Sequence, residues 1–139
     1  PHASAGVDDI ELVVVGAHMS GLPLNGELTS LGGRFLREAE TQADYRLFAL
    51  PGGPPHRPGL LRVEAGQGSA IKTEVWALSA ASFGAFVSKV PAPLSIGTVR
   101  LADGTAPKGF VVEAQGIIGA RDISDLGGWR AFVQQVAHA

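Results

Sequence analysis

Short apolar runs divided by glycine and proline fill much of the chain and predict strands. The run IELVVVG, residues 10–16, is rich in β-branched side chains and ends at glycine, which indicates a central strand buried on both faces. Alternating apolar and polar positions predict two further strands, over residues 33–41 and 45–50. The prolines and glycines of residues 51–59 then predict a loop.

Four later segments also have the composition of strands. Residues 60–65 and 70–78 flank the sequence GQGS, which is typical of a hairpin. Residues 98–104 end in an Asp-Gly pair, a turn signal that precedes another strand at residues 108–114. The sheet is therefore expected to be mostly antiparallel.

Helical spacing occurs in three places. Residues 26–31 predict a brief helix with Asn25 as its N-terminal cap. Ser79 is expected to cap a helix over residues 80–90, where apolar side chains recur at i, i+3, i+4 and i+7, and residues 129–137 repeat this spacing. Strands with two or three helices predict an α+β domain whose sheet can curl into a small barrel.

Composition narrows the class of protein. The 139 residues are 45% hydrophobic, which suits one core, and a net charge of -2 with scattered basic residues argues against a nucleic-acid partner. No apolar run approaches the roughly 20 residues that cross a bilayer, so no membrane partner is expected. The expected location is the cytoplasm. Because the chain begins at Pro1 without a methionine, residues 1–9 are expected to be a linker or tag remnant, and residues 10–139 a single domain.

Common catalytic motifs are missing, which leaves His18 as the main candidate. The P-loop and dinucleotide-binding patterns are absent, the histidines lack metal-ligand spacing and there is no cysteine, so neither a cofactor nor a metal is expected. Ser20 lies in HMSGL, which lacks the first glycine of a serine nucleophile motif, and its hydroxyl is expected to bond its own loop. His18 follows the first strand, where loops often contact ligands; acid-base chemistry and a structural bond to a carbonyl both remain open.

Other charged residues are expected at the surface. Glu74 lies within an apolar strand and is expected to point to solvent, the alternative being an inward carboxyl with a raised pKa. Lys108 and Arg121 lie at strand or loop ends, where solvated charges are usual.

The motifs taken together resemble a known family. In this order the chain contains VVVGAHMSGLPLN, YRLFALPG, RPGLLRV, EVWALS, VPAPLSIGTVRLADG, KGFVVEA, GARDIS and GGWRAF. These segments, spread over residues 11–136, resemble the C-terminal domain of allophanate hydrolases. The resemblance implies a γ-glutamylcyclotransferase-like fold: a small, mixed-direction β-barrel flanked by helices, with a ligand pocket at the loop after the first strand.

The same resemblance implies a set of site residues. His18 would be the acid or hydrogen-bond donor. The equivalent loop would bind the substrate through the backbone of Gly16, Ala17, Met19, Ser20 and Gly21. As a hypothesis of mechanism, Asn25, Lys108 and Arg121 are expected to orient the second carboxylate. Cyclotransferases also rely on a glutamate after the helix that follows the EVW-like strand. Residues 86–97 contain no acidic residue here, which argues against γ-glutamyl cyclisation.

The function implied by the resemblance has two main alternatives. In complete allophanate hydrolases an amidase-type domain hydrolyses allophanate, and in some members the C-terminal domain is implicated in decarboxylating N-carboxycarbamate. The chain would then bind a small dicarboxylate and assist this step of urea and allophanate degradation. In the alternative it is a non-catalytic module that forms homo-oligomers or docks to an amidase partner. A third reading is a free-standing relative that acts on another small amide or carboxylate.

Overall fold

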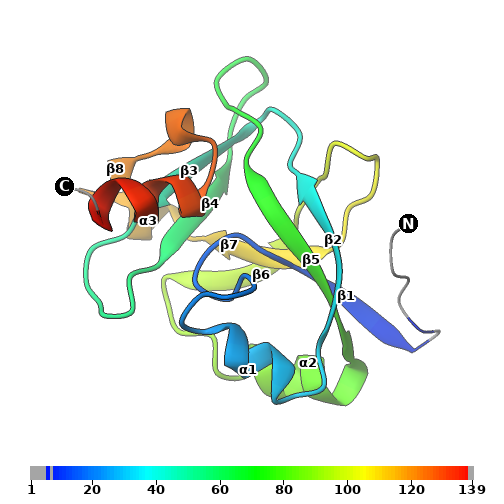
Figure 1. The fold of residues 1–139 in the computed structure, drawn as a ribbon. Helices are drawn as coiled ribbons and strands as arrows, with labels where there is room; N and C mark the ends of the chain where they lie inside the picture. Colours follow the sequence, from blue (N-terminus) through cyan, green and yellow to red (C-terminus); the bar gives the residue numbers. More distant parts are fainter. Residues whose placement is uncertain (1–5, 7, 138–139) are drawn as a thin grey trace.

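The computed structural model describes residues 6 and 8–137, and within them it has the predicted α+β composition (Figure 1). The elements are β1 (Asp9–Val14), α1 (Asn25–Thr29), β2 (Arg34–Glu40), β3 (Tyr45–Ala49), β4 (Pro58–Arg62), β5 (Lys72–Ser79), α2 (Ala80–Val87), β6 (Leu94–Thr98), β7 (Lys108–Val112), the 3-10 helix η1 (Ala114–Ile117), β8 (Arg121–Asp122), the 3-10 helix η2 (Ser124–Leu126) and α3 (Trp129–Ala137). No helix in this part of the chain has the length and apolar character needed to cross a membrane.

The strands lie in two sheets. One has the order β2-β5-β1-β7-β6 and the other β4-β3-β8. Strand β1 runs parallel to β7 and antiparallel to β5, so the larger sheet is mixed in direction. Closure of the described strands into a barrel is not confirmed. Figure 1 shows α1 and α2 together at one end of the larger sheet, and α3 beside the smaller sheet.

Strand β1 is the centre of the core, as its apolar sequence predicts. Leu12, Val13 and Val14 have no exposed surface, and β5 and β7 pair with the two edges of the strand. Gly109 permits the close approach of β7, since a Cβ atom there would lie 2.7 Å from the Cβ of Val13. The chain therefore leaves β1 from inside the protein, and the loop that carries His18 starts at a rigid point.

The helix caps follow the sequence in one case and depart from it in another. The Ser79 side chain accepts a hydrogen bond from the backbone N–H of Ser82, which confirms it as the cap of α2. The cap expected at Asn25 is wrong, because Leu24 occupies the cap position of α1 and the Asn25 side chain instead donates to the carbonyl of His18 at 2.8 Å. Asn25 thus braces the His18 loop.

One expected strand arrangement is also wrong, and in another the first strand lies earlier than expected. No hairpin joins β4 and β5, because β4 pairs with β3 in the smaller sheet and β5 pairs with β1 and β2 in the larger one. Strand β6 lies at Leu94–Thr98, earlier than the segment 98–104 that alternation favours, but it pairs antiparallel with β7 across a turn that contains Asp103 and Gly104, as the Asp-Gly pair predicts. Segment 99–105 instead forms the turn into β7, with the N–H of Leu101 donating to the carbonyl of Thr105. Apolar patterning predicts extended chain but does not choose its partner strand.

Candidate functional site

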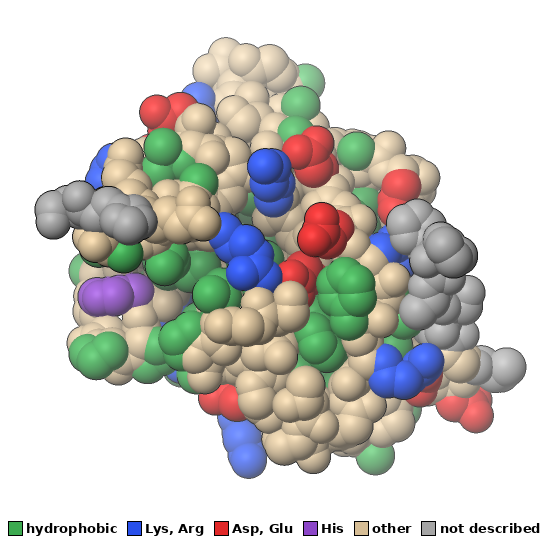
Figure 2. All heavy atoms as spheres, in the orientation of Figure 1, with side chains coloured by type: hydrophobic (Ala, Val, Ile, Leu, Met, Phe, Trp, Pro, Cys, Tyr) green, Lys and Arg blue, Asp and Glu red, His purple; other side chains and the backbone are tan. Residues whose placement is uncertain are grey.

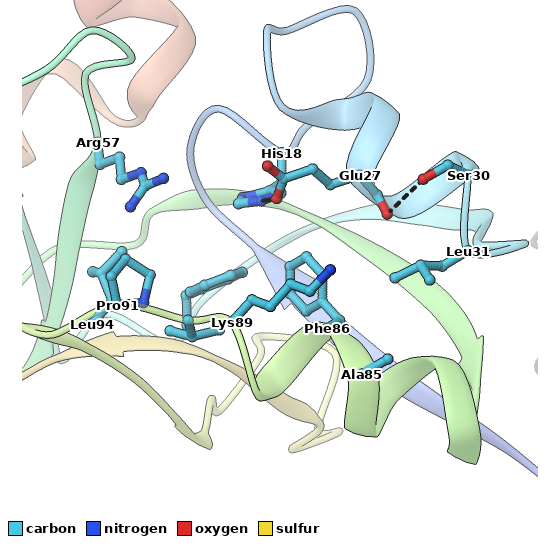
Figure 3. Close-up of a pocket in the computed structure, with 12 residues that line it drawn as sticks. His18, Glu27, Ser30, Leu31, Arg57, Ala85, Phe86, Lys89, Pro91 and Leu94 are labelled. Atoms are coloured by element: carbon cyan, nitrogen blue, oxygen red, sulfur yellow. Dashed lines mark hydrogen bonds and ion pairs between the residues drawn. The ribbon is translucent and has the colours of Figure 1, made fainter.

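A cavity of about 260 Å³ opens between α1, α2 and β7 (Figure 3). Its lining residues are His18, Glu27, Ser30, Leu31, Arg57, Ala85, Phe86, Lys89, Val90, Pro91, Leu94 and Phe110. In Figure 3 the Arg57 guanidinium points toward His18, and the Lys89 side chain extends past Phe86 on another side of the cavity. Aromatic and aliphatic walls therefore surround a few charged groups, a common composition for a small-molecule site.

The His18 side chain is held against the cavity wall. Its ring is stacked on Phe110, with centroids 5.1 Å apart, and meets Phe86 edge-on at 5.2 Å. Nε2 lies 2.8 Å from a carboxylate oxygen of Glu27. Because a carboxylate only accepts hydrogen bonds, this contact assigns the ring hydrogen to Nε2, and Nδ1 forms no hydrogen bond with a described residue.

Burial governs the charge of His18. The side chain is only 13% exposed, and this loss of solvation lowers the pKa of His18 below its ordinary value of 6.5. The hydrogen bond and negative charge of Glu27 act in the opposite direction, while the positive charge of Arg57 adds to the lowering. The ring is therefore mainly neutral at neutral pH, and an arriving anion would favour its protonated form.

Arg57 is a part of this site that sequence patterns missed. Its Nε atom is buried and has no hydrogen-bond partner among the described residues, and its guanidinium forms no ion pair with them. The residue ends the proline-rich loop before β4, which only the fold brings to the His18 loop. An arginine among prolines and glycines was the available signal, but loop arginines are too common for it to be selective.

A small hollow of about 20 Å³ adjoins the cavity beneath the loop after β1. It is lined by Val15, Gly16, Ala17, His18, Arg57, Pro58, Leu94 and Phe110. The N–H groups of Ala17 and His18 donate to no oxygen of residues 6 and 8–137. Since roughly 10–15 Å³ is enough for a water molecule, one carboxylate oxygen would fit this hollow.

Glu74 differs from its expected position. It is 3% exposed rather than solvated, and it accepts hydrogen bonds from the backbone and hydroxyl of Ser20, from the Trp76 indole and from Arg130. Burial alone would raise the pKa of Glu74, but these donors together bring it below its ordinary value. The alternative of a raised pKa is therefore also wrong, because the charged form is fully hydrogen-bonded.

The sequence predicts that the N–H groups of residues 17–21 bind a ligand, but two of them already donate to groups of the protein. The N–H of Met19 donates to the carbonyl of Gly16, and the N–H of Ser20 to Glu74. Gly21 adopts a positive φ of 77°, a conformation that favours glycine and allows the chain to turn at this point of the loop. Gly16, Ala17 and His18 remain as the loop residues that line the hollow.

The sequence of the whole chain establishes its family. A family model of the allophanate hydrolase C-terminal domain matches residues 10–134. The chain belongs to this family. It is 44% identical over 130 residues to urea amidolyase of Saccharomyces cerevisiae, a match that covers 91% of this chain and 7% of that relative. The chain thus spans only a small part of its curated relatives.

Solved structures agree with this assignment of an allophanate hydrolase C-terminal domain. Allophanate hydrolase of Kluyveromyces lactis matches with a TM-score of 0.88 at 39% identity, covering 91% of this chain and 21% of that one. A uropathogenic E. coli-specific protein matches with a TM-score of 0.83 at 40% identity, covering 91% and 96% of the two chains. An AIG2-like protein of Mus musculus (ggact) has a TM-score of 0.58 at 14% identity over 78% and 82% of the chains, which confirms the γ-glutamylcyclotransferase-like fold.

The remaining predicted site residues of this domain lie away from the cavity. The Lys108 ammonium donates to the Thr98 hydroxyl, and Arg121 lies on β8 beside Gln135 and the ring of Phe132 in α3. Neither lines the His18 cavity. Lys89 does, from the segment between α2 and β6 where cyclotransferases would carry their glutamate.

An acidic residue nevertheless reaches the cavity of this allophanate hydrolase C-terminal domain, from a different element. Glu27 lies in α1 and is paired with His18. Within residues 6 and 8–137, no group of three or more His, Asp or Glu side chains is arranged to hold a metal ion. The His18–Glu27 pair can transfer a proton, and the Arg57 and Lys89 cations that line the same cavity can bind an anion.

Replacing Glu27 with glutamine is expected to lower the pKa of His18 further. The amide oxygen can still accept the Nε2 hydrogen, but the negative charge that favours the imidazolium is lost. A pH titration of the histidine ring signals by NMR measures the change. Glu64→Gln, an exposed carboxylate in the loop after β4, is the matched control and should leave the His18 titration unchanged. An unaltered or raised His18 pKa in Glu27→Gln would contradict the pairing.

Proposed function

We propose that the domain binds a small dicarboxylate in the His18 cavity and assists the decarboxylation of N-carboxycarbamate during the degradation of urea through allophanate. The observation that carries this proposal is the buried Nε of Arg57, which has no hydrogen-bond partner among the residues that the structure describes. A buried guanidinium nitrogen without an acceptor is costly, and a bound carboxylate would supply that acceptor. The similarity to urea amidolyase and allophanate hydrolase supports the reaction context.

The charges of the cavity favour a ligand with two negative groups. Arg57 and Lys89 contribute two cations, whereas Glu27 is the acidic lining residue and is already paired with His18. The buried Phe86 and Phe110 side chains and the partial burial of Arg57 strengthen the attraction between a carboxylate and that guanidinium, whereas Lys89 is exposed and its charge is screened by solvent. One carboxylate would bind Arg57 and the N–H groups at the hollow, leaving the other near Lys89.

The reaction needs a proton at nitrogen. When the C–N bond of N-carboxycarbamate breaks, CO2 leaves, the bonding electron pair passes to nitrogen, and that nitrogen takes up a proton to form carbamate. The two negative charges of the bound ligand would raise the pKa of His18 and protonate Nδ1. Nδ1–H would then transfer this proton to the ligand nitrogen, while Nε2–H stays hydrogen-bonded to the Glu27 carboxylate. Arg57 and the loop N–H groups would stabilise the charge that develops on the remaining carboxylate.

Titration with malonate, a stable small dicarboxylate, tests this function directly. We expect malonate to bind in the His18 cavity and to shift the His18 ring signals. It should also raise the pKa of His18, because a dianion stabilises the imidazolium. Two-dimensional NMR of the histidine rings follows both effects.

Matched ligands separate charge recognition from shape. Malonamide has a similar size but no charge and should leave the His18 signals unchanged, while acetate should act only at much higher concentration. Absence of any malonate effect on His18 would reject dicarboxylate binding in this cavity.

A further inference from the structure

The loop that carries His18 is hydrogen-bonded to an ionic cluster that lies outside the His18 cavity and centres on the buried carboxylate of Glu74. Ser20 lies two residues after His18, and both its N–H and its hydroxyl donate to Glu74, each at 2.8 Å. Trp76 donates to the same carboxylate at 3.0 Å. A carboxylate that is 3% exposed and bonded in this way fixes the position of the groups that bond to it.

Arg130 connects this cluster to the last helix. One of its terminal nitrogens lies 2.7 Å from the carbonyl oxygen of Ser20 and 2.8 Å from Glu74 Oε2. Arg130 is in the first turn of α3, and Ser20 precedes it by 110 positions, so this contact exists only in the folded chain. The C-terminal helix therefore bonds directly to the loop that carries His18.

The cluster does not share the His18 cavity. It borders a separate hollow whose charged lining includes Glu38, Glu40, Lys72 and Arg130. Figure 2 shows acidic and basic side chains gathered on this face, over the region of β2, β5 and α3 in Figure 1. None of the cluster residues lines the cavity between α1 and α2, so any effect on a ligand there must pass through the loop.

We propose that Ser20, Glu74 and Arg130 are positioning residues, which hold the loop so that the His18 ring stays stacked on Phe110 and within reach of Glu27. This inference rests on the proposed function for its consequence in ligand binding, but the loop placement itself does not depend on any ligand. Helix α3 thus contributes to the His18 site without touching it.

Arg130→Ala tests the role of α3. The Arg130 side chain is 46% exposed, so its removal should leave the fold intact by circular dichroism. We expect the His18 ring protons of the ligand-free variant to lose part of the shift caused by the Phe110 and Phe86 rings, and malonate affinity to fall roughly tenfold. Arg130→Lys, whose ammonium offers three donors, should restore much of both readouts.

Two comparisons make the result decisive. Arg34→Ala removes an arginine of similar exposure, which lies at the start of β2 and pairs with Asp9, and should change neither readout. Ser20→Ala should reproduce the Arg130→Ala shifts, and the double variant should show less than additive change because the residues share Glu74. Unchanged His18 ring shifts in both single variants would overturn the positioning role, whereas failure of malonate to bind the unsubstituted protein would overturn the proposed function alone.

Discussion

Replacing His18 with alanine is expected to slow decarboxylation of N-carboxycarbamate roughly a hundredfold, the usual effect of removing one donor to a developing charge. The substitution removes the only ring nitrogen of the cavity that can deliver a proton to the ligand nitrogen, among the residues that the structure describes. The measurement is CO2 release from N-carboxycarbamate generated in place by a separate allophanate-hydrolysing amidase. The spontaneous rate without the domain is subtracted.

Two further variants control for indirect effects. His18→Gln keeps most of the side-chain volume between Phe86 and Phe110, so a loss of activity there reports chemistry rather than a cavity in the core. His56→Ala removes another histidine, whose Nδ1 lies 3.0 Å from the Gly52 carbonyl in an exposed loop, and should retain full activity. An unchanged rate in folded His18→Ala would exclude the catalytic role and favour the assembly or docking module.

Replacing Arg57 with glutamine is expected to weaken malonate binding about tenfold to a hundredfold. A hydrogen bond to a charged group contributes roughly 1.5–3 kcal/mol, and each 1.4 kcal/mol changes affinity tenfold. Because the Arg57 charge also lowers the pKa of His18, the ligand-free variant should show a higher His18 pKa than the unsubstituted protein. Isothermal titration calorimetry and the histidine NMR titration measure the two effects.

Arg62→Gln is the matched control for this substitution. It removes an arginine from the other end of β4, where Arg62 pairs with Asp44 at the surface, and should leave malonate affinity unchanged. Equal affinities for malonate in Arg57→Gln and the unsubstituted protein would show that the unpartnered guanidinium is not the anion site.

Local patterns predicted the elements that depend on neighbouring residues. The apolar run of β1 and the capping serine of α2 act through their own segment, so the sequence identified both. Pairing between distant strands was harder, because β4 and β5 have similar apolar composition and yet belong to different sheets. Nothing in either segment specifies which edge it will meet.

Residues of the site followed the same division. His18 was found because it directly follows a buried strand. Arg57 and Lys89 were missed because their loops come from distant parts of the chain, and an exposed charge is their ordinary reading. The burial of Glu74 cannot be predicted from its neighbours in the sequence, because two of its donors, Ser20 and Arg130, lie 54 and 56 positions away.

Local periodicity along the chain predicts the α+β class and a histidine in the loop after the central strand. The order of its motifs identifies the allophanate hydrolase C-terminal family, which the family model confirms. The surroundings of that histidine come from the tertiary fold: the aromatic stack, the Glu27 partner, the Arg57 nitrogen that has no partner among the described residues, and the Ser20–Glu74–Arg130 cluster. Their effects depend on distances of a few ångströms and on burial, and both arise only when remote segments pack together.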